Sequence, residues 1–315
     1  AYFFMDNTKI LFSDESDKHT DRIERLSAHK RRTIDLLRYV NCKFTTLTPS
    51  QKFRYSDCHS YLVFHNYLTI GKIKLSHVEH CDLHLICPLC AIRRASKKTL
   101  LYGKKVQELL SNNPNLNLYY VVLTVKDDEN LEKAYQHLTK AQKTLVQRRK
   151  DAQKYLKTGN KKYISAMSSS FARVEAGAYS IEVKRGKNSG LWHPHTNFLL
   201  LTEHDIKKED LINEWESITG DSFIVHCEKV SSNQNIKDTL IEIFKYAMKF
   251  SEMELEDNLF AWETLKGRRM TGSFGAFRGL DVNDENDELD EDENIEFTEI
   301  FYKFLSGNYK KVDCL

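Results

Sequence analysis

The chain has 315 residues, with 47 basic and 45 acidic side chains and a formal net charge of +2. This length allows a sizeable core, in one large or two small domains. No apolar run is long enough to span a bilayer, and residues 1–12 lack the apolar segment and cleavage site of a signal peptide. We therefore expect a cytoplasmic protein without a membrane partner.

The small net charge conceals a polarised chain. Residues 281–315 hold twelve acidic and three basic side chains, whereas residues 1–280 hold 44 basic and 33 acidic ones. A basic body suits an anionic partner such as nucleic acid, although a solvated surface would give the same composition. We predict that the acidic run 281–296 is a flexible loop or tail.

The order of the predicted elements indicates an α+β fold. Helical patterns cover residues 13–40, 91–111, 129–157, 208–218 and 236–250. Strand patterns cover residues 118–125, 176–183, 191–201 and 223–227, and the turn 186–190 joins the middle two into a hairpin. We expect an antiparallel central sheet covered by helices, with an N-terminal helical and zinc-binding region (1–110), a central domain built on this sheet (111–280) and an acidic C-terminal segment (281–315).

Four cysteines gather in the first third of the chain: Cys58, Cys81, Cys87 and Cys90. The last two form a C-x2-C pair, Cys87-Pro88-Leu89-Cys90, which is typical of structural zinc sites with four ligands. A disulfide, a redox pair or unligated thiols are the alternatives, but disulfides are rare in the cytoplasm and a thioredoxin-like βαβ context is absent. The remaining cysteines look isolated: Cys42, Cys227 and Cys314.

A basic helix is predicted directly after the cysteine pair. Its first turns carry Arg93, Arg94, Lys97 and Lys98. Zinc bound by the cysteines would hold this cationic helix in place, so we expect the four side chains to contact DNA. A solvated helix face is the alternative.

Two histidines stand at the start of the predicted strand 191–201, as His193-Pro194-His195. Residues i and i+2 of a strand project from the same face, so both imidazoles can approach one metal ion. Glu182, on the preceding strand, could complete a three-ligand set with positions open for substrate oxygens, and Glu175 is the competing candidate. Histidine ligands favour Mn²⁺, with Mg²⁺ as the alternative.

The predicted helix 236–250 carries Glu242, Tyr246 and Lys249. Their spacings of four and three residues place all three side chains on one helix face. A tyrosine near a metal ion can attack a phosphodiester and stay covalently linked to the 5′ phosphate.

These motifs resemble those of HUH endonucleases, specifically plasmid rolling-circle replication initiators with a single catalytic tyrosine. The resemblance rests on Val122-Leu123-Thr124-Val125, His193-Pro194-His195 and Glu242-x3-Tyr246-x2-Lys249, together with the CPxC core and the basic helix. It extends from the cysteine cluster to about residues 273–275. Family members often have a further aromatic residue or histidine where this chain has Thr196-Asn197. The chain also lacks a GxxxxGK[ST] loop, which matches plasmid initiators and differs from viral initiators with fused helicases.

The resemblance implies an RRM/ferredoxin-like palm in which Tyr246 is the nucleophile and His193 and His195 bind the metal. The resemblance carries over less directly to Glu182, which would be the third ligand. Glu242 would activate water for the terminating cleavage, and Lys249 or the metal would help to stabilise the tyrosine phenolate. The implied partners are origin DNA, single-stranded or in a hairpin, a host helicase and polymerase, and a possible second copy of the chain.

Three alternative functions fit parts of the sequence. A transposase or conjugative relaxase would use the same site, although relaxases usually carry a longer histidine cluster. A histidine-triad hydrolase needs a third histidine at position 197, which is Asn197 here. A zinc-stabilised DNA-binding regulator would explain the cysteines and the basic helix, but would leave Glu242, Tyr246 and Lys249 as coincidence.

Overall fold

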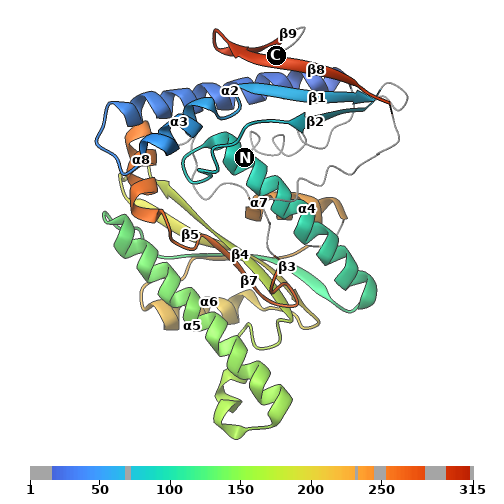
Figure 1. Cartoon of the computed structure of the whole chain (residues 1–315). Coiled ribbons are helices and arrows are strands. Elements are labelled where there is room, and N and C mark those ends of the chain that lie inside the picture. The colour runs from blue at the N-terminus through green and yellow to red at the C-terminus, as the bar shows by residue number, and fades with distance from the viewer. Residues whose placement is uncertain (1–15, 68–71, 231–232, 245–252, 281–295, 313–315) are drawn as a thin grey trace. The chain divides into compact units, whose positions relative to one another are not determined.

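The computed structural model describes residues 16–67, 72–230, 233–244, 253–280 and 296–312. The chain forms two compact units (Figure 1). The first comprises Ala1–Lys97, Glu254–Glu263 and Val282–Leu315, and the second comprises Lys98–Met253 and Thr264–Asp281. Helix α4 (Pro88–Asn112) begins in the first unit and ends in the second.

The second unit is built on a five-stranded sheet with the order β6-β3-β5-β4-β7. All neighbouring strands are antiparallel. The strands are β3 (Asn117–Thr124), β4 (Ala176–Arg185), β5 (Trp192–Thr202), β6 (Val225–Val230) and β7 (Thr271–Gly275).

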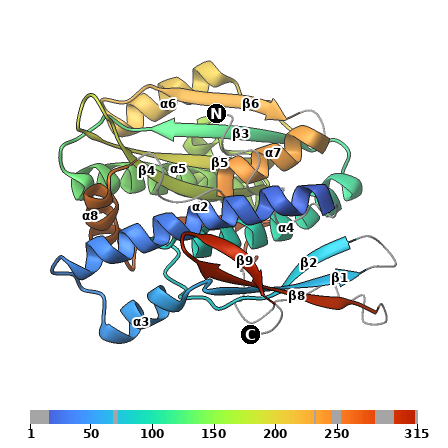
Figure 2. The same ribbon diagram turned by 90° about the horizontal axis from the view of Figure 1, so that it is seen from above.

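Helices cover both faces of this sheet (Figures 1 and 2). Helices α5 (Leu131–Thr158) and α6 (Lys208–Thr219) pack on one face, and the 3-10 helix η1 (Lys161–Ser168) packs against α5. Helix α7 (Asn233–Phe244) and the second half of α4 pack on the other face.

The central strand β5 explains this two-sided arrangement. Phe198, Leu199, Leu200 and Leu201 are fully buried, because a strand covered on both faces must be apolar on both. Successive side chains alternate between the faces. Leu199 and Leu201 join the apolar core under α7, and the Phe198 ring packs edge-on against Phe171 on the other side, with ring centres 5.5 Å apart.

The first unit has its own sheet, in the order β2-β1-β8-β9, also antiparallel. Its elements are α2 (Ser16–Asn41), α3 (Pro49–Asp57), β1 (Tyr61–Tyr67), β2 (Lys72–His77), α8 (Leu255–Leu265), β8 (Thr298–Leu305) and β9 (Asn308–Val312). The β8–β9 hairpin is fixed to the N-terminal residues: Arg31 donates to the Gly307 carbonyl at 2.8 Å, and the Tyr309 hydroxyl donates to the His59 carbonyl at 2.6 Å.

The structure confirms the α+β class and the antiparallel sheet covered by helices. Each of the first four predicted helices corresponds to an observed one: α2, α4, α5 and α6. The fifth prediction, 236–250, corresponds to α7 up to Phe244, and residues 245–250 lie outside the described residues. The sequence analysis missed α3, η1, α8, β7 and every strand of the first sheet, because these are short and lack a clear apolar period.

The C-terminal residues differ most from expectation. The predicted division placed 281–315 in a separate acidic segment, whereas residues 298–312 form two strands that extend the sheet of the first unit beside β1. The acidic run itself lies outside the described residues, except for Glu296. Among the helices that the structure does describe, none has the length and apolar character to cross a membrane.

On the adjacent strands β4 and β7, Gly177 leaves room for the ring of Phe274, and Gly272 leaves room for the ring of Tyr179. A Cβ atom on Gly177 would lie 2.1 Å from Cζ of Phe274, which is far inside van der Waals contact. The Phe274 ring cannot move freely, because the Arg149 guanidinium lies 4.9 Å from its centre. We therefore expect Gly177→Ala to lower the free energy of unfolding by about 1–3 kcal/mol, the usual range for overpacking.

Urea unfolding followed by circular dichroism measures this change. Gly103→Ala is the matched control: its Cβ would lie 3.5 Å from Leu240, an ordinary contact, and inside helix α4 alanine is favoured over glycine by about 1 kcal/mol. Equal stability of the Gly177→Ala variant and the wild type would contradict the packing argument.

Candidate functional site

The two histidines lie at the start of β5 and face the side of the sheet that α7 covers. In the register of the sheet, His195 is opposite Glu182 on β4 and opposite Thr124 on β3. The Nε2 atom of His195 is 3.4 Å from a carboxylate oxygen of Glu182, and the two imidazole rings are 5.7 Å apart. The carboxylate is 1% exposed and the histidines are partly exposed, so the imidazoles stand between the core and solvent.

Asp127 holds the first histidine in place, a contact that the sequence analysis did not identify. Its carboxylate is 2.5 Å from Nδ1 of His193. Asp128 pairs with Trp192 through two backbone hydrogen bonds, and this pairing brings the segment after β3 beside the start of β5. A histidine that contacts a carboxylate through one ring nitrogen presents the other to a metal, as ligating histidines commonly do. The signal in the sequence was an aspartate three residues after the end of the apolar strand β3.

The donor set fits a divalent metal ion in part. Two ligands at about 2.1 Å from one ion, at a tetrahedral angle, are about 3.4 Å apart, and this is the separation of His195 and Glu182. The Nδ1 atom of His195 is buried and has no hydrogen-bond partner among the described residues. The candidate ligand atoms of His193, His195 and Glu182 do not all lie within 4.8 Å of one another. The groups of described residues that meet this limit all include at least one cysteine.

Glu175 lies far from the histidines. It precedes β4, where Ala176 pairs with Leu201 at the opposite end of β5, about 20 Å along the strand from His195. Its backbone carbonyl accepts a hydrogen bond from Arg149. The geometry therefore leaves Glu182 as the better of the two candidates for the third ligand.

Helix α7 brings Glu242 to the same face of the sheet. The Ser180 hydroxyl donates to the Ile243 carbonyl and so fixes the end of α7 on β4, two residues before Glu182. Burial raises the pKa of the neighbouring Tyr120, and the carboxylates of Glu242 and Glu182 add to this effect. Both acids are thus close to one phenol. Tyr246 and Lys249, from the same predicted motif, lie outside the described residues.

The four predicted zinc ligands come together in the first unit. Their sulfur atoms all lie within 4.8 Å of one another, and the closest pairs are Cys81–Cys90 at 3.5 Å, Cys58–Cys90 at 3.6 Å and Cys58–Cys87 at 3.7 Å. Four sulfurs at about 2.3 Å from a tetrahedral zinc ion are about 3.8 Å apart. All four cysteines are buried. They come from the end of α3, the loop after β2 and the start of α4, so a bound ion would join three segments.

The surroundings of the sulfurs suit a buried anionic centre. The Lys30 ammonium donates to the Cys58 carbonyl and is almost fully buried, and burial lowers its pKa. Burial also lowers the pKa of His59 to about 3, so this imidazole is neutral. Together with His80 and Cys90, His59 forms a second group of possible ligands. The four cysteines remain the set that matches tetrahedral sulfur geometry.

The basic helix is less open than expected. Lys98 is 7% exposed, and its ammonium donates to the Thr271 hydroxyl and lies 6.0 Å from the Phe244 ring. The prediction that Lys98 contacts DNA is therefore not supported by its position, because the chain folds this ammonium into the second unit. Arg93, Arg94 and Lys97 are partly exposed.

Comparison with known proteins agrees with the motifs. A family described as replication protein matches residues 72–303. This chain belongs to that family. One relative, Protein rep of Staphylococcus aureus, is 23% identical over 206 residues, which are 62% of this chain and 81% of that protein. Another, Protein rep of Streptococcus pneumoniae serotype 2 (strain D39 / NCTC 7466), is 22% identical over 227 residues, 67% of this chain and 65% of that protein.

No solved structure matches the chain. The family match spans both the cysteine pair and the histidine strand of this replication protein, and it also includes the acidic run. It therefore confirms the resemblance to a plasmid rolling-circle replication initiator, which the sequence analysis drew from three short motifs. The roles of individual residues do not follow from the match.

The cysteine geometry generates a test of zinc binding. Cys87→Ser should remove the bound zinc and lower the melting temperature by about 10 °C, because the free energy of binding to a structural site contributes to folding. Elemental analysis of the purified protein and thermal unfolding measure the two effects.

Cys227→Ser is the matched control, since this half-buried thiol belongs to no ligand group among the described residues. It should keep both the zinc and the melting temperature. A wild-type protein with less than half a zinc ion per chain would contradict the assignment.

Proposed function

We propose that this replication protein starts rolling-circle replication by cutting one strand of plasmid origin DNA, with Tyr246 as the nucleophile. One observation carries the proposal: His193, His195 and Glu182 lie on one face of the sheet, and helix α7, which carries Glu242, packs on that same face. Because the chain belongs to a family of replication proteins, this combination of residues is a candidate for phosphodiester chemistry.

His193, His195 and Glu182 would hold the divalent ion, Mn²⁺ or Mg²⁺, with His193 oriented by Asp127. When bound, such an ion supplies Lewis-acid polarisation of the scissile phosphate. The fold holds the ligand side chains in position before an ion binds. Glu182 is held in the β4–β5 register opposite His195, and Asp127 prevents rotation of the His193 ring.

The nucleophile assignment rests on the motif spacing. The Tyr246 hydroxyl would lose its proton and form a bond to phosphorus, while the bond from phosphorus to the 3′ oxygen breaks and that oxygen takes up a proton. An unperturbed tyrosine has a pKa of about 10, so Lys249 would stabilise the phenolate. The product is a 5′-phosphotyrosyl link and a free 3′-hydroxyl. The hydroxyl can prime a host polymerase, and the link conserves the bond energy for rejoining.

Two alternative functions predict different products from the same experiment. A transposase or relaxase would also form the tyrosine adduct, but would not require an origin of replication as its preferred substrate. A zinc-stabilised regulator would bind DNA without cutting it. The buried contact between His195 and Glu182 has no role in a regulator, and this favours an enzyme.

The first test concerns the nucleophile. Tyr246→Phe should abolish the covalent protein–DNA adduct, by about 10³-fold or more, while DNA binding changes little, because only the attacking oxygen is lost. Adduct formation on single-stranded origin DNA with Mn²⁺, resolved on a denaturing gel, measures this. Nicking of supercoiled origin plasmid provides a second readout.

Tyr120→Phe is the control. Burial raises the pKa of this tyrosine and its hydroxyl donates to Asn197 at 3.0 Å, so it is a poor nucleophile although it lies near the acids. An adduct in the Tyr246→Phe variant that disappears in the Tyr120→Phe variant would reassign the nucleophile. His195→Ala should abolish Mn²⁺-dependent nicking while the fold survives, and wild-type rates across a Mn²⁺ titration would show that this strand is not the metal site.

The second test concerns Glu242 and the end of replication. A single-tyrosine initiator must release itself after one round, and a carboxylate one helical turn before Tyr246 can take a proton from water so that hydroxide makes the final cut. Glu242→Gln should therefore form the adduct at the wild-type rate but lose hydrolytic release at the terminating site by about 10²-fold. Equal release rates in the variant and the wild type would leave Glu242 as a structural residue.

A further inference from the structure

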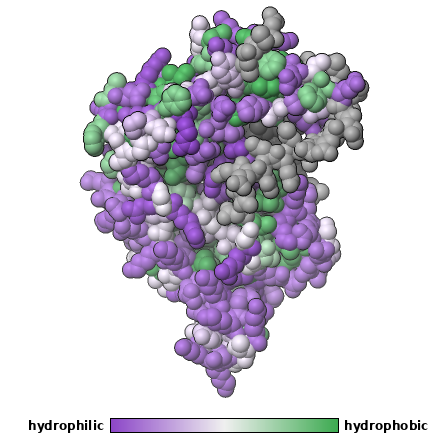
Figure 3. Space-filling model, in the orientation of Figure 1, coloured by the Kyte–Doolittle hydropathy of each residue, from purple (hydrophilic) through white to green (hydrophobic). Residues whose placement is uncertain are grey.

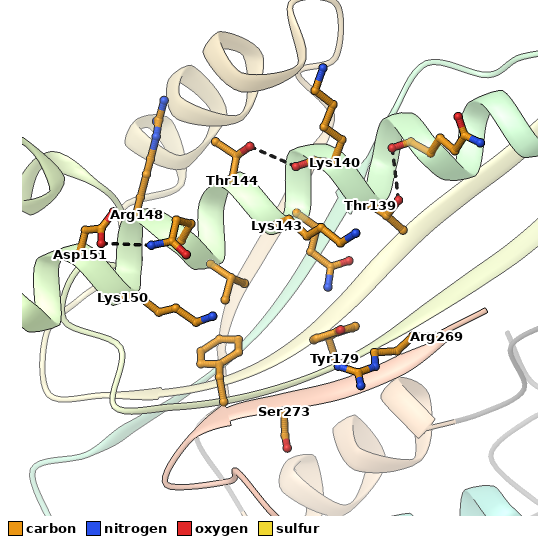
Figure 4. A pocket seen from close by; sticks show the side chains of 15 residues that line it. Thr139, Lys140, Lys143, Thr144, Arg148, Lys150, Asp151, Tyr179, Arg269 and Ser273 are labelled. Carbon is orange, nitrogen blue, oxygen red and sulfur yellow. Dashed lines mark hydrogen bonds between the residues drawn. The ribbon is translucent and has the colours of Figure 1, made fainter. Parts of the chain in front are cut away.

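A groove runs along helix α5 on the far side of the sheet from the candidate site. It has a volume of about 960 Å³, and it lies between α5 and the sheet edge formed by β4 and β7 (Figure 4). Tyr179 lines the groove from β4, whereas Glu182 projects from the opposite face of the same strand. The groove is therefore separate from the histidine site, although both belong to the second unit.

The lining of the groove is strongly basic. It includes five cationic side chains, Lys140, Lys143, Arg148, Lys150 and Arg269, and a single carboxylate, Asp151. In Figure 4, Lys143 and Lys150 extend from α5 toward the strands, while Lys140 and Arg148 point away from them.

The charges of Lys143 and Lys150 are not neutralised within the protein. Arg148 pairs with Glu214, and Asp151 is within 3.3 Å of Lys154. Among the described residues, by contrast, Lys143 and Lys150 form no ion pair, and both are exposed. Hydrophilic residues also cover the end of α5 and η1 beyond the groove (Figure 3). Lys143 and Lys150 therefore present unpaired positive charge to solvent.

Two aromatic residues line the strand side of the groove: Tyr179, which is partly exposed, and Phe274, which is buried. The rings of Tyr179 and Phe274 lie over Gly272 and Gly177, because a Cβ atom at either glycine would collide with the ring. Burial raises the pKa of Tyr179, and the neighbouring Arg269 and Gln142 on α5 oppose this effect. A second line of polar groups, including Gln136, Thr139 and Gln147, borders the same space.

Cations along one wall and an aromatic floor are the combination that binds single-stranded nucleic acid. Ammonium groups contact successive phosphates, and rings contact the faces of unpaired bases, which a duplex hides. Lys143 and Lys150 are seven residues apart, or about 10 Å along the helix. Two ammonium groups at that separation can each contact a different phosphate of one strand.

We propose that the α5 groove is a second binding site for single-stranded DNA, with phosphates along Lys143 and Lys150 and a base at Tyr179. The proposal rests on the proposed function for the identity of the polyanion, since an origin-cutting protein meets single-stranded DNA. A strand held here would remain attached to the protein while the other face of the sheet holds the cut site.

The test compares two double variants in fluorescence anisotropy with a labelled single-stranded oligonucleotide at several salt concentrations. Lys143→Gln/Lys150→Gln should weaken binding about tenfold at low salt and reduce the slope of log affinity against log salt by about 1.4, because two phosphate contacts are lost at about 0.7 each. Lys161→Gln/Lys207→Gln removes the same charge from exposed positions outside the groove and should leave the slope unchanged.

Each outcome supports or overturns the groove as a site. Equal affinities and slopes in the two variants overturn it, and an equal loss of duplex and single-strand binding overturns the choice of a single strand. Adduct formation on a short oligonucleotide that covers only the nick should persist in the groove variant. If the wild type forms no adduct, the proposed function fails while the anisotropy comparison still decides whether the groove binds DNA.

Discussion

The register between β4 and β5 is the constraint on which the candidate site depends. Glu182 lies opposite His195 because Ala176 pairs with Leu201 and each step along the hairpin preserves the pairing. In this register Leu199 and Leu201 lie beside Ala178 and Ala176 in the core under α7. The same burial that stabilises the strand therefore aligns a carboxylate with an imidazole.

Each face of this sheet carries a candidate site, and the alternation of side chains separates the two. On β4, Ser180 and Glu182 face α7, whereas Tyr179 faces α5 and lines the basic groove. One strand thus supplies a candidate metal ligand to one side and an aromatic surface to the other. The two sites are joined by the rigid sheet between them rather than by any shared side chain.

The first unit is stabilised in a different way. Its four-stranded sheet depends on strands from opposite ends of the chain, with β8 beside β1, and the cysteine cluster lies at the end of α3 and the start of α4. Metal binding by Cys58, Cys81, Cys87 and Cys90 would tie these local segments together, whereas backbone hydrogen bonds tie the distant ones. Lys30 contributes to the same region by donating to the backbone carbonyl of Cys58.

The sequence by itself determined the α+β class, the histidine hairpin and the cysteine set, because each depends on local spacing: alternation in β5, helical periods in α2 and α5, and a C-x2-C pair. Only the tertiary structure decided the rest. Asp127 reaches His193 through a bridge between segments 64 residues apart, Glu175 lies at the wrong end of its strand, and Lys98 is buried. The sequence did not show that β8 and β9 belong to the first sheet. The partner of β8 is β1, more than 200 residues away, and pairing at such a separation leaves no local pattern.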